Sequence, residues 1–447
     1  MSDSITRRNF VGTAAATAAG LGAARTANSQ VRGASTKKLA LFGGPKAVQE
    51  KRPDWPVVEQ NDEEQWAAVL RSGKWNRWAG NYVKTFEEKW SEELGGKRVL
   101  AVSNGTAALV TAAFAVELAP HDEVLVPPAT YCATVNPVLL HGALPVFVDT
   151  DPETFQMDAS KIEAAITPRT KGIIPVHLGG AAADMDTIMA IAKKHSLWVI
   201  EDGCEAAKAE WRKQKLNTIG TVGCFSFQAS KNFTCGEGGA VVINDMSLYE
   251  RCACFHTNGW MPGAKTDTVL MNGINYRLTE FQGALLLSQL TRLEEQQRIR
   301  ESNAAYLSAQ LREIPGIMPA RMYEGCTRNA YYGYMVRRKK EAFGGVSREK
   351  FLRALGAEGV PVGALKEALH KEPFLKQTFN SRMYRSIYSP KEIAECEEKM
   401  HCPQNDLVNE EGMWITGRVL NGSRRIAEQI AEAFRKVHAN IGELAKA

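Results

Sequence analysis

The sequence lacks several features that would assign it at once to a class of protein. Its net charge of +5 over 447 residues is spread along the chain, with no basic run interleaved with aromatic residues, which argues against nucleic-acid binding. It contains no internal repeat and no long low-complexity segment. The hydrophobic content of 44% and the charged content of 23% are those of a globular protein, and the length allows a large core and two domains.

The cysteines form no disulfide framework that can be read from the sequence. There are nine, an odd number, and they are scattered along the chain. The one close pair, Cys252-x-Cys254, has no matching second pair, so we predict no zinc site and no other metal. Several cysteines lie inside the motifs described below, and we interpret them as small buried hydrophobic residues.

The N-terminus has no apolar stretch of the ~20 residues that a membrane span needs, and we expect no stable membrane insertion. Thr6-Arg-Arg-Asn-Phe-Val11 is followed by a mildly apolar run, rich in Gly, Ala and Thr, that ends at Ala24. This segment, residues 1–30, resembles a twin-arginine export signal. A disordered, alanine-rich tail is the alternative. The signal predicts a periplasmic or exported protein, and a cytoplasmic one if it is not used.

Apolar runs alternate with helical patterns from residue 98 onwards. We predict strands at 98–102, 123–126, 144–148, 172–176 and 197–200, and helices at 106–118, 159–166 and 185–195. Strands separated by helices argue for a mainly parallel sheet covered on both faces. A long helical pattern then extends from about 275 to 311. A smaller α/β unit follows, with a strand at 330–336 and helices at 348–355 and 426–437.

Lys231 lies in a glycine-rich stretch between two predicted strands. Phe225 and Phe227 alternate with polar residues on the first strand, and residues 240–244 form the second. Burial between strands removes water from a lysine, which would lower its pKa and favour the neutral amine that attacks carbonyl groups. A solvated surface lysine is the ordinary alternative.

Asp202 follows the apolar run 197–200, 29 residues before Lys231. A strand-end aspartate and a lysine that forms a Schiff base are the pair that pyridoxal phosphate chemistry requires. The aspartate keeps the pyridine nitrogen protonated, so that the ring accepts electrons, and the lysine holds the aldehyde and then moves protons. We therefore predict Lys231 and Asp202 as catalytic residues of a pyridoxal 5'-phosphate enzyme.

The motif Phe-Ser-Phe-x-x-x-Lys-x-x-x-x-Gly-Glu-Gly-Gly, preceded by Val-Ile-Glu-Asp, resembles the DegT/DnrJ/StrS family of sugar aminotransferases. The resemblance extends from about Leu39 to Val437. It implies an α/β, aspartate-aminotransferase-like fold, which is fold type I of the pyridoxal phosphate enzymes. The large cofactor-binding domain, residues 31–295, would contain an N-terminal arm and a mostly parallel seven-stranded sheet, and residues 296–447 would form a smaller α/β domain.

The resemblance also implies further cofactor-binding residues. It assigns Gly105 and Thr106, at the start of a predicted helix, and the hydroxyl of Ser226 to the cofactor phosphate; from the sequence alone, Gly105 and Thr106 could be an ordinary helix start. Tyr131 matches the aromatic residue that stacks on the pyridine ring. Asn275 matches a position from which the family reaches the phosphate of the neighbouring subunit, which implies a homodimer with shared active sites.

Some positions depart from the family pattern. Glu205 stands where the family commonly has glutamine near the phenolic oxygen of the cofactor, where a second anion would repel the phenolate. It could be protonated, pair with Lys208 or point elsewhere. Trp414 lies in a segment where relatives often carry a Pro-His pair on the substrate side. His177 could line the pocket or be a structural residue.

These features predict a pyridoxal-phosphate-dependent aminotransferase that transfers an amino group from glutamate or glutamine to a keto-sugar or keto-cyclitol. One alternative is a sugar dehydratase of the same family, but those relatives replace the lysine with histidine, and Lys231 argues against this. The other is an exported protein that binds the cofactor without turnover.

Overall fold

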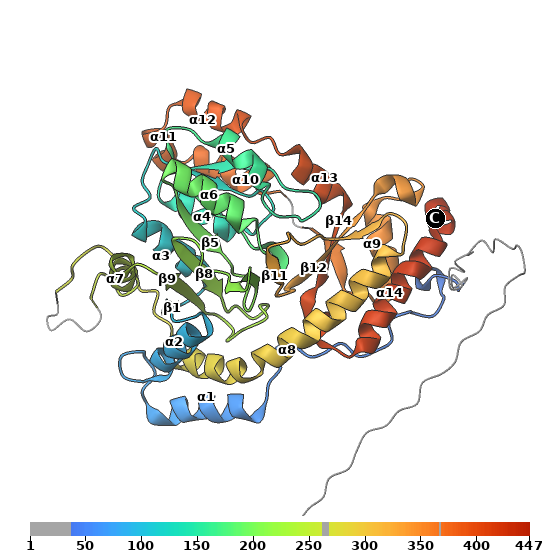
Figure 1. The fold of residues 1–447 in the computed structure, drawn as a ribbon, viewed down its shortest axis with the longest axis horizontal. Helices are drawn as coiled ribbons and strands as arrows, with labels where there is room; N and C mark the ends of the chain where they lie inside the picture. The colour runs from blue at the N-terminus through green and yellow to red at the C-terminus, as the bar shows by residue number, and fades with distance from the viewer. Residues whose placement is uncertain (1–36, 262–267, 366–367) are drawn as a thin grey trace, which may run out of the picture. The chain divides into compact units, whose positions relative to one another are not determined.

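The predicted alternation of strands and helices forms a seven-stranded sheet. The computed structural model describes residues 37–261, 268–365 and 368–447, so the predicted export signal lies outside the described residues (Figure 1). The strand order is β1-β9-β8-β5-β4-β2-β3. The strands are β1 (Arg98–Val102), β2 (Glu123–Val126), β3 (Leu144–Phe147), β4 (Thr170–Ile173), β5 (Trp198–Asp202), β8 (Val222–Ser226) and β9 (Gly239–Ile243).

Five neighbouring strands of this sheet are parallel, and only β9 runs antiparallel, to both β8 and β1. The prediction of a mostly parallel seven-stranded sheet is therefore confirmed. Strands β2 and β3 are buried at every position, as expected where helices cover both faces of a sheet.

Helices cover both faces of this sheet. One face packs against α3 (Gly105–Ala115), α4 (Asn136–Leu140) and α7 (Met246–Phe255). The opposite face packs at one end against α5 (Ile162–Ala165) and α6 (Met185–His195). At the other end it packs against α2 (Tyr82–Glu93) and α8 (Glu280–Arg312). Alternate residues of β1 point into the two cores, which is the period of a strand.

A second, antiparallel sheet has the order β10-β12-β14-β13. Its strands are β10 (Ile317–Pro319), β12 (Gly333–Arg338), β13 (Val362–Ala364) and β14 (Gly412–Thr416). Two helices, α9 (Arg348–Ala357) and α14 (Arg424–Ala439), cover it, close to their predicted bounds. A third, short sheet has the order β11-β6-β7. Its strands are β6 (Glu210–Trp211), β7 (Gln214–Lys215) and β11 (Cys326–Arg328).

Helix α8 packs against elements beside both of the two large sheets. It contacts α1 (Gln60–Ser72) and α2 beside the seven-stranded sheet, and β10 and α14 beside the four-stranded sheet (Figure 1). The described residues form one compact unit by their contacts. The division of the chain at residue 295 stays a prediction.

The segment between β13 and β14 gave no clear pattern in the sequence. It forms α10 (Pro373–Phe379), α11 (Arg382–Ile387), α12 (Pro390–Glu398) and α13 (Pro403–Glu411). Side chains of the first three, among them Leu375, Tyr384 and Cys396, join the core that α3 and α4 form on the seven-stranded sheet. The final helix is α15 (Ile441–Lys446).

The cysteines and the helix compositions can be compared with the expectations from the sequence. All nine cysteines fall within the described residues, where they are free thiols, and seven of them are buried. In the part of the chain that the structure describes, no helix combines the length and apolar composition needed to cross a membrane.

Candidate active site

The ends of β5 and β8 and the turn before α3 open into a cavity of about 730 Å³. Most of the predicted site residues line it, namely Gly105, Thr106, Tyr131, Asp202, Glu205, Ser226 and Lys231. Lys231 and Asp202 thus face one cavity, although one lies in a loop and the other at the end of strand β5. This is the arrangement that a single small cofactor held at two points requires.

Asp202 is the last residue of β5, and each oxygen of its carboxylate accepts a hydrogen bond. The Thr134 hydroxyl donates to Oδ2 at 2.7 Å, and the backbone N–H of Cys204 donates to Oδ1 at 3.2 Å. Thr130 extends the chain through a 2.8 Å hydroxyl contact with Thr134. Asp202 is only 5% exposed, so these contacts fix the direction in which the carboxylate faces the cavity.

Lys231 lies in the loop between β8 and β9, and its amine is surrounded by polar and aromatic groups. Its Nζ is 3.5 Å from Oε1 of Glu205 and 4.3 Å from the ring centroid of Tyr332. The loop is fixed on both sides of the lysine. Trp55, in the predicted N-terminal arm, donates from Nε1 to the Ala229 carbonyl, and the Asn232 amide donates to the Ala330 carbonyl.

The expected low pKa of Lys231 is wrong for the protein without cofactor. Burial lowers the pKa of this amine and is the largest single influence, but the charges of Glu205 and Asp202, with Tyr332 and Cys204, together outweigh it and raise the pKa. The expectation rested on desolvation alone and omitted the second carboxylate. Lys231 is therefore an ammonium ion near neutral pH in this structure.

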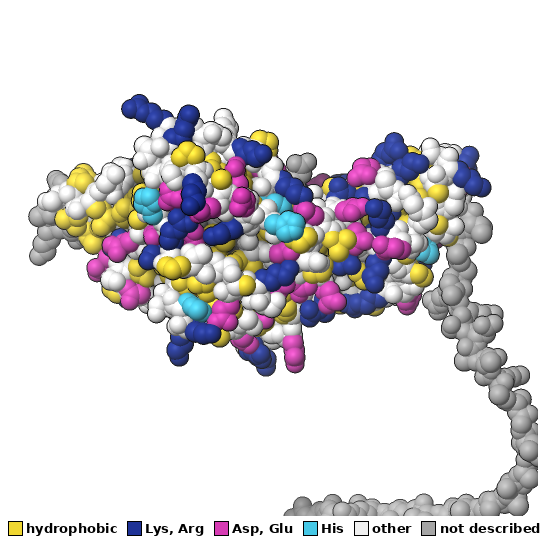
Figure 2. All heavy atoms as spheres, turned by 90° about the horizontal axis from the view of Figure 1, so that it is seen from above, with side chains coloured by type: hydrophobic (Ala, Val, Ile, Leu, Met, Phe, Trp, Pro, Cys, Tyr) yellow, Lys and Arg dark blue, Asp and Glu magenta, His cyan; other side chains and the backbone are white. Residues whose placement is uncertain are grey.

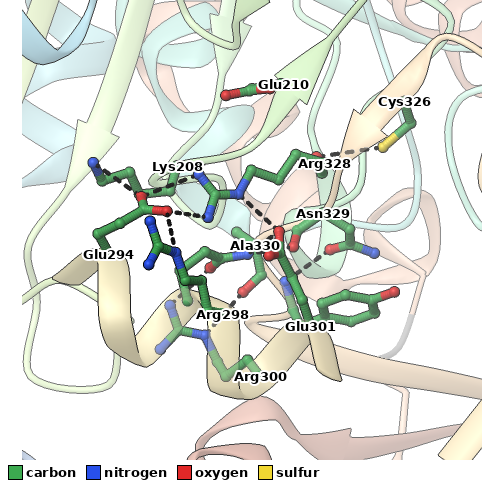
Figure 3. A network of polar contacts seen from close by, with 12 residues as sticks. Lys208, Glu210, Glu294, Arg298, Arg300, Glu301, Cys326, Arg328, Asn329 and Ala330 are labelled. Carbon is green, nitrogen blue, oxygen red and sulfur yellow. Dashed lines mark hydrogen bonds and ion pairs between the residues drawn. The ribbon is translucent and has the colours of Figure 1, made fainter. Parts of the chain in front are cut away.

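Glu205 pairs with Lys231 and not with Lys208. Its second oxygen, Oε2, accepts the backbone N–H of Gly179 at 2.8 Å, which holds the carboxylate in the cavity. Lys208 contacts Glu93 and lies 3.4 Å from Glu294 on α8. Figure 3 shows Lys208 in this separate network. The alternatives that Glu205 pairs with Lys208 or points elsewhere are therefore wrong, because it lines the cavity and its partner is the lysine predicted to be catalytic.

The same network supports the Lys231 loop from α8. Arg300 is fully buried, and its Nε donates at 3.2 Å to the Ala330 carbonyl that also accepts from Asn232 (Figure 3). Gln297, one turn earlier, donates to the carbonyl of Asn329. The long helix thereby positions both the loop that carries Lys231 and the strand entry that carries Tyr332.

Gly105, Thr106 and Ser226 also line the cavity, and Gly105 and Ser226 lie against each other. The first N–H groups of a helix have no partner within the helix, and Gly105 and Thr106 supply these groups at the start of α3, while Asn104 caps Ala107 at 2.8 Å. A Cβ on Gly105 would come within 2.7 Å of the Ser226 Cβ, so glycine permits this close approach. Oriented N–H groups, a helix N-terminus and a hydroxyl form a cradle suited to an anion.

Tyr131 and Asn275 differ from the other predicted residues. Tyr131 lines the cavity but is 58% exposed, so its predicted stacking on the cofactor ring stays a prediction. Asn275 is exposed, does not line the cavity of its own chain and pairs through its backbone with Thr257. Its predicted role in a neighbouring subunit stays a prediction.

Two residues that complete the site were not predicted from the sequence. Thr134 orients Asp202, and Tyr332 covers Lys231 and also touches the Ser230 hydroxyl at 3.0 Å. Tyr332 lies in the strand predicted at 330–336, but that strand begins at Gly333, which leaves the tyrosine at its entrance. Only the packing of the two sheets brings it to the lysine, so no local signal marked it.

His177 is a structural residue. Its ring is fully buried, with Nε2 at 3.1 Å from Glu201, and Nδ1 accepts the backbone N–H of Ala183. It does not line the cavity. Within the described ranges, no group of three or more His, Cys, Asp and Glu side chains is arranged to hold a metal ion.

Comparison with known proteins decides the family. The model of the DegT/DnrJ/EryC1/StrS aminotransferase family matches residues 56–405. The chain belongs to this family. Its members include a putative L-glutamine:3-amino-2,3-dideoxy-scyllo-inosose aminotransferase of Streptoalloteichus tenebrarius, 35% identical over 417 residues, which cover 92% of this chain and 100% of that protein. GDP-perosamine synthase of Caulobacter vibrioides is 36% identical over 299 residues, which cover 67% of this chain and 80% of that protein.

The solved structures agree with this assignment. An aminotransferase from Psychrobacter cryohalolentis is 30% identical and superimposes with a TM-score of 0.77, covering 88% of this chain and 100% of that one. The fold is therefore the aspartate-aminotransferase-like fold type I, as predicted, and family and fold are those of pyridoxal-phosphate-dependent aminotransferases.

The residues around the cavity have the chemistry that pyridoxal phosphate needs. The cradle at Gly105, Thr106 and Ser226 suits its phosphate, and a space that a Cβ on Gly105 would fill is kept open beside it. The carboxylate of Asp202 suits a protonated ring nitrogen, and the amine of Lys231 suits the aldehyde. The donor set therefore fits the cofactor.

Proposed function

We propose that the protein is an aminotransferase that binds pyridoxal 5'-phosphate in this cavity and transfers an amino group from glutamate or glutamine to the ketone of a sugar or cyclitol. The observation that carries the proposal is the placing of Lys231, Asp202 and an anion cradle around one cavity. The names of the relatives supply the donor and acceptor classes: one is a glutamine:inosose aminotransferase and another makes a nucleotide-linked amino sugar.

The cofactor, when bound, supplies an electron sink for the carbon that gains or loses the amino group. Lys231 is the residue that holds a proton and moves it at the reacting carbon, since its amine is the basic group inside the cavity. Asp202 would stabilise the positive charge of a protonated ring nitrogen. Glu205 keeps a proton on the Lys231 amine before the cofactor arrives, and Tyr332 shields that amine from solvent.

Spectroscopy of the purified protein tests the proposal. Incubation with pyridoxal phosphate followed by borohydride should fix the cofactor to Lys231, which peptide mass spectrometry would locate, and Lys231→Ala should remain unlabelled. Glutamate or glutamine should then convert the visible absorbance of the loaded protein. Labelling of another lysine would refute the assigned site, and labelling of Lys231 without spectral conversion would leave a cofactor-binding protein without turnover.

A homodimer with shared active sites is part of the proposal. Hydrophobic side chains that are exposed in the single chain flank residues 262–267, namely Trp260, Val269, Leu270 and Ile274. Figure 2 shows hydrophobic side chains gathered beside a grey segment at one end of the molecule. Such a patch is typical of a protein interface, and Asn275 follows it directly. Sedimentation should give the mass of two chains.

Export by the twin-arginine route is also proposed, on the sequence of residues 1–30 alone. This route carries folded proteins, which suits a cofactor enzyme whose cysteines are free. Cell fractionation should place the full-length protein outside the cytoplasm, and the double variant Arg7→Lys, Arg8→Lys should stay inside. An unprocessed N-terminus on protein confined to the cytosol would refute export.

A further inference from the structure

Tyr332 lies between two cavities, beside the Lys231 amine. A second cavity, of about 170 Å³, adjoins the cofactor cavity, and the two share Thr130, Tyr131, Glu205 and Tyr332. The ring of Tyr332 lies over Lys231, with 4.3 Å between its centroid and the amine nitrogen. The side chain of Tyr332 therefore borders both the space for the cofactor and the space next to it.

The hydroxyl of Tyr332 is paired with a second hydroxyl. Its oxygen lies 3.0 Å from the Oγ of Ser230, which precedes Lys231 in the same loop. Either hydroxyl can be the donor, so a proton can pass between them in both directions. Ser230 is itself fixed, because its backbone N–H donates at 2.7 Å to the side chain of Gln228. The pair places an exchangeable proton beside the amine.

The ring of Tyr332 is held at the entrance of β12. The N–H of Gly417 donates to the Tyr332 carbonyl at 2.9 Å. The indole of Trp414 lies at 5.8 Å from the tyrosine ring, with an interplanar angle of 68°. A Cβ on Gly333 would lie 2.1 Å from that indole, so Trp414 rests directly on the backbone next to Tyr332. These contacts keep the phenol in place.

The exchange of a carbonyl oxygen for nitrogen needs an acid in addition to Lys231. When an amine condenses with a carbonyl group, the nitrogen bonds to the carbon and loses two protons. The oxygen gains two protons and leaves as water, so the step requires no oxidant or reductant. In cofactor loading Lys231 is the nitrogen nucleophile, and another group has to give the oxygen its proton.

Among the described groups that act most strongly on the Lys231 amine, Tyr332 is the one hydroxyl. The others are the carboxyl groups of Glu205 and Asp202 and the thiol of Cys204. Burial, together with the Asp202 charge, raises the pKa of the Cys204 thiol well above its usual value, so this thiol retains its proton. A carboxylate has no proton to give, whereas a phenol can give one and take it back.

We propose that the hydroxyl of Tyr332, paired with Ser230, is a second acid–base group of this site and serves the oxygen that leaves as water. In each of the two proton transfers it gives its proton to the oxygen and takes one from the nitrogen, so the tyrosine ends unchanged. The same hydroxyl acts when Lys231 bonds to the cofactor aldehyde and when a substrate carbonyl group reacts. This inference rests on the proposed function, in which Lys231 moves the proton at carbon.

The rate of cofactor loading tests the proposal without turnover. Cofactor-free protein is mixed with pyridoxal phosphate, and borohydride-trapped Lys231 is quantified over time. Tyr332→Phe keeps the ring over the amine and removes only the hydroxyl. Loading should then be about 10²-fold slower, which is the size of a typical general-acid contribution. A loss of less than about tenfold would overturn the proposal.

Tyr334→Phe is the matched control. The Tyr334 hydroxyl lies 2.8 Å from the Oγ of Ser308, which is the same kind of pair, and Tyr334 lies on β12 but lines neither cavity. Its loading rate should stay within about threefold of that of the unchanged protein, because no acid is lost from the site. Equal slowing by Tyr334→Phe and Tyr332→Phe would show an effect through the fold and overturn the proposal.

A double variant tests the pairing with Ser230. Ser230→Ala should slow loading less than Tyr332→Phe does, because the phenol keeps its own proton. The double variant should be no slower than Tyr332→Phe alone, since the two hydroxyls act as one unit. Additive losses would show that the hydroxyls act separately and overturn the proposed pair.

Exchange of a carbon-bound hydrogen separates Tyr332 from Lys231. In heavy water, the loaded protein should exchange the α-hydrogen of glutamine or glutamate through Lys231, a step in which no water is gained or lost. Tyr332→Phe should exchange it within about threefold of the unchanged rate, while spectral conversion, which consumes water, falls about 10²-fold. Equal loss of exchange and conversion would place the effect at Lys231 and overturn the proposal.

The same measurements distinguish this inference from the proposed function. If the unchanged protein shows neither labelling of Lys231 nor spectral conversion, the proposed function fails, and this inference fails with it. If the unchanged protein shows both and Tyr332→Phe matches its rates, the aminotransferase function stands and the role of Tyr332 is overturned.

Discussion

At the scale of single residues, the site depends on two carboxylates with different partners. Asp202 is oriented by Thr134 and by a backbone N–H, while Glu205 is oriented by the Gly179 N–H and faces the Lys231 amine. Both line one cavity, but only Glu205 contacts the Lys231 amine. Substitution of Asp202 and substitution of Glu205 should therefore have different effects.

Removing the charge of Asp202 should nearly abolish turnover. Asp202→Ala leaves a protonated ring nitrogen without its anion, which costs about 3–5 kcal/mol, or roughly 10²–10⁴-fold in affinity or rate. Cofactor affinity and the rate of donor conversion are the measurements. Thr134→Val removes one hydrogen bond to the same carboxylate and should give a loss of only about 1.5–3 kcal/mol. Near-normal turnover by Asp202→Ala would contradict the assigned role.

Removing the charge of Glu205 should change the pH dependence of cofactor loading. The pKa of Lys231 is raised although burial lowers it, since Glu205 heads the influences that raise it. The neutral amine attacks the aldehyde, so loading accelerates as pH rises through that pKa. In Glu205→Gln the pKa falls, and the loading profile should move to lower pH. Loading at neutral pH should be about tenfold faster or more, because a larger fraction of the amine is then neutral.

The measurement is the rate at which cofactor absorbance develops after mixing with cofactor-free protein, from about pH 6 to pH 10. Glu237→Gln is the matched control, because Glu237 lines the same cavity but is not among the groups that raise the Lys231 pKa. A profile unchanged in Glu205→Gln would show that the carboxylate does not control the amine.

At the scale of elements, the start of α3 depends on the absence of one side chain. Gly105→Ala would place a Cβ 2.7 Å from the Ser226 Cβ and 3.1 Å from the Cys204 sulfur. Such crowding costs about 1–3 kcal/mol and fills the anion cradle, so both thermal stability and cofactor affinity should fall. Gly356→Ala is the control. Gly356 is helical in α9 with no atom within 4 Å of an added Cβ, so alanine there should stabilise by about 0.5–1 kcal/mol. Equal effects of the two substitutions would contradict this account.

The elements found in the sequence were those with local signals. Helix α6 has the predicted bounds, with Asp184 as its N-cap and an apolar stripe. Helix α1 was not predicted, because it buries little apolar surface and one of its two buried residues, Asp62, pairs with Arg292 of α8. The short helices α10–α12 escaped because each buries only one or two residues, too few to show a helical period.

The residues of the candidate site that belong to a sequence motif could be predicted from the sequence. Lys231, Asp202 and Ser226 lie on or beside adjacent strands, so sequence order alone places them together. Tyr332 and Thr134 could not be predicted, because contacts between distant segments bring them to the site. The pKa direction of Lys231 failed for the same reason, as it depends on a side chain 26 residues away in the sequence.

At the scale of the whole molecule, both sheets contribute to one site. Lys231 and Asp202 come from the seven-stranded sheet, Trp414 lies on the four-stranded sheet and Tyr332 at its edge. Helix α8 contacts the surroundings of both and holds the Ala330 carbonyl through Arg300. Residues from both sheets and their loops line the two adjoining cavities, so the relative position of the sheets determines the shape of the site.

The predicted homodimer adds a second chain to the same argument, and mixed dimers test it. If Asn275 acts in the neighbouring subunit, a dimer of Lys231→Ala with Asn275→Ala has one site with both defects and one with none. Refolding the two inactive or weakened variants together at limiting cofactor should then restore about a quarter of the wild-type sites, because half of the dimers are mixed. Activity is measured against each variant refolded alone. If Asn275 served its own chain, every site would keep one defect, and mixing would restore no activity.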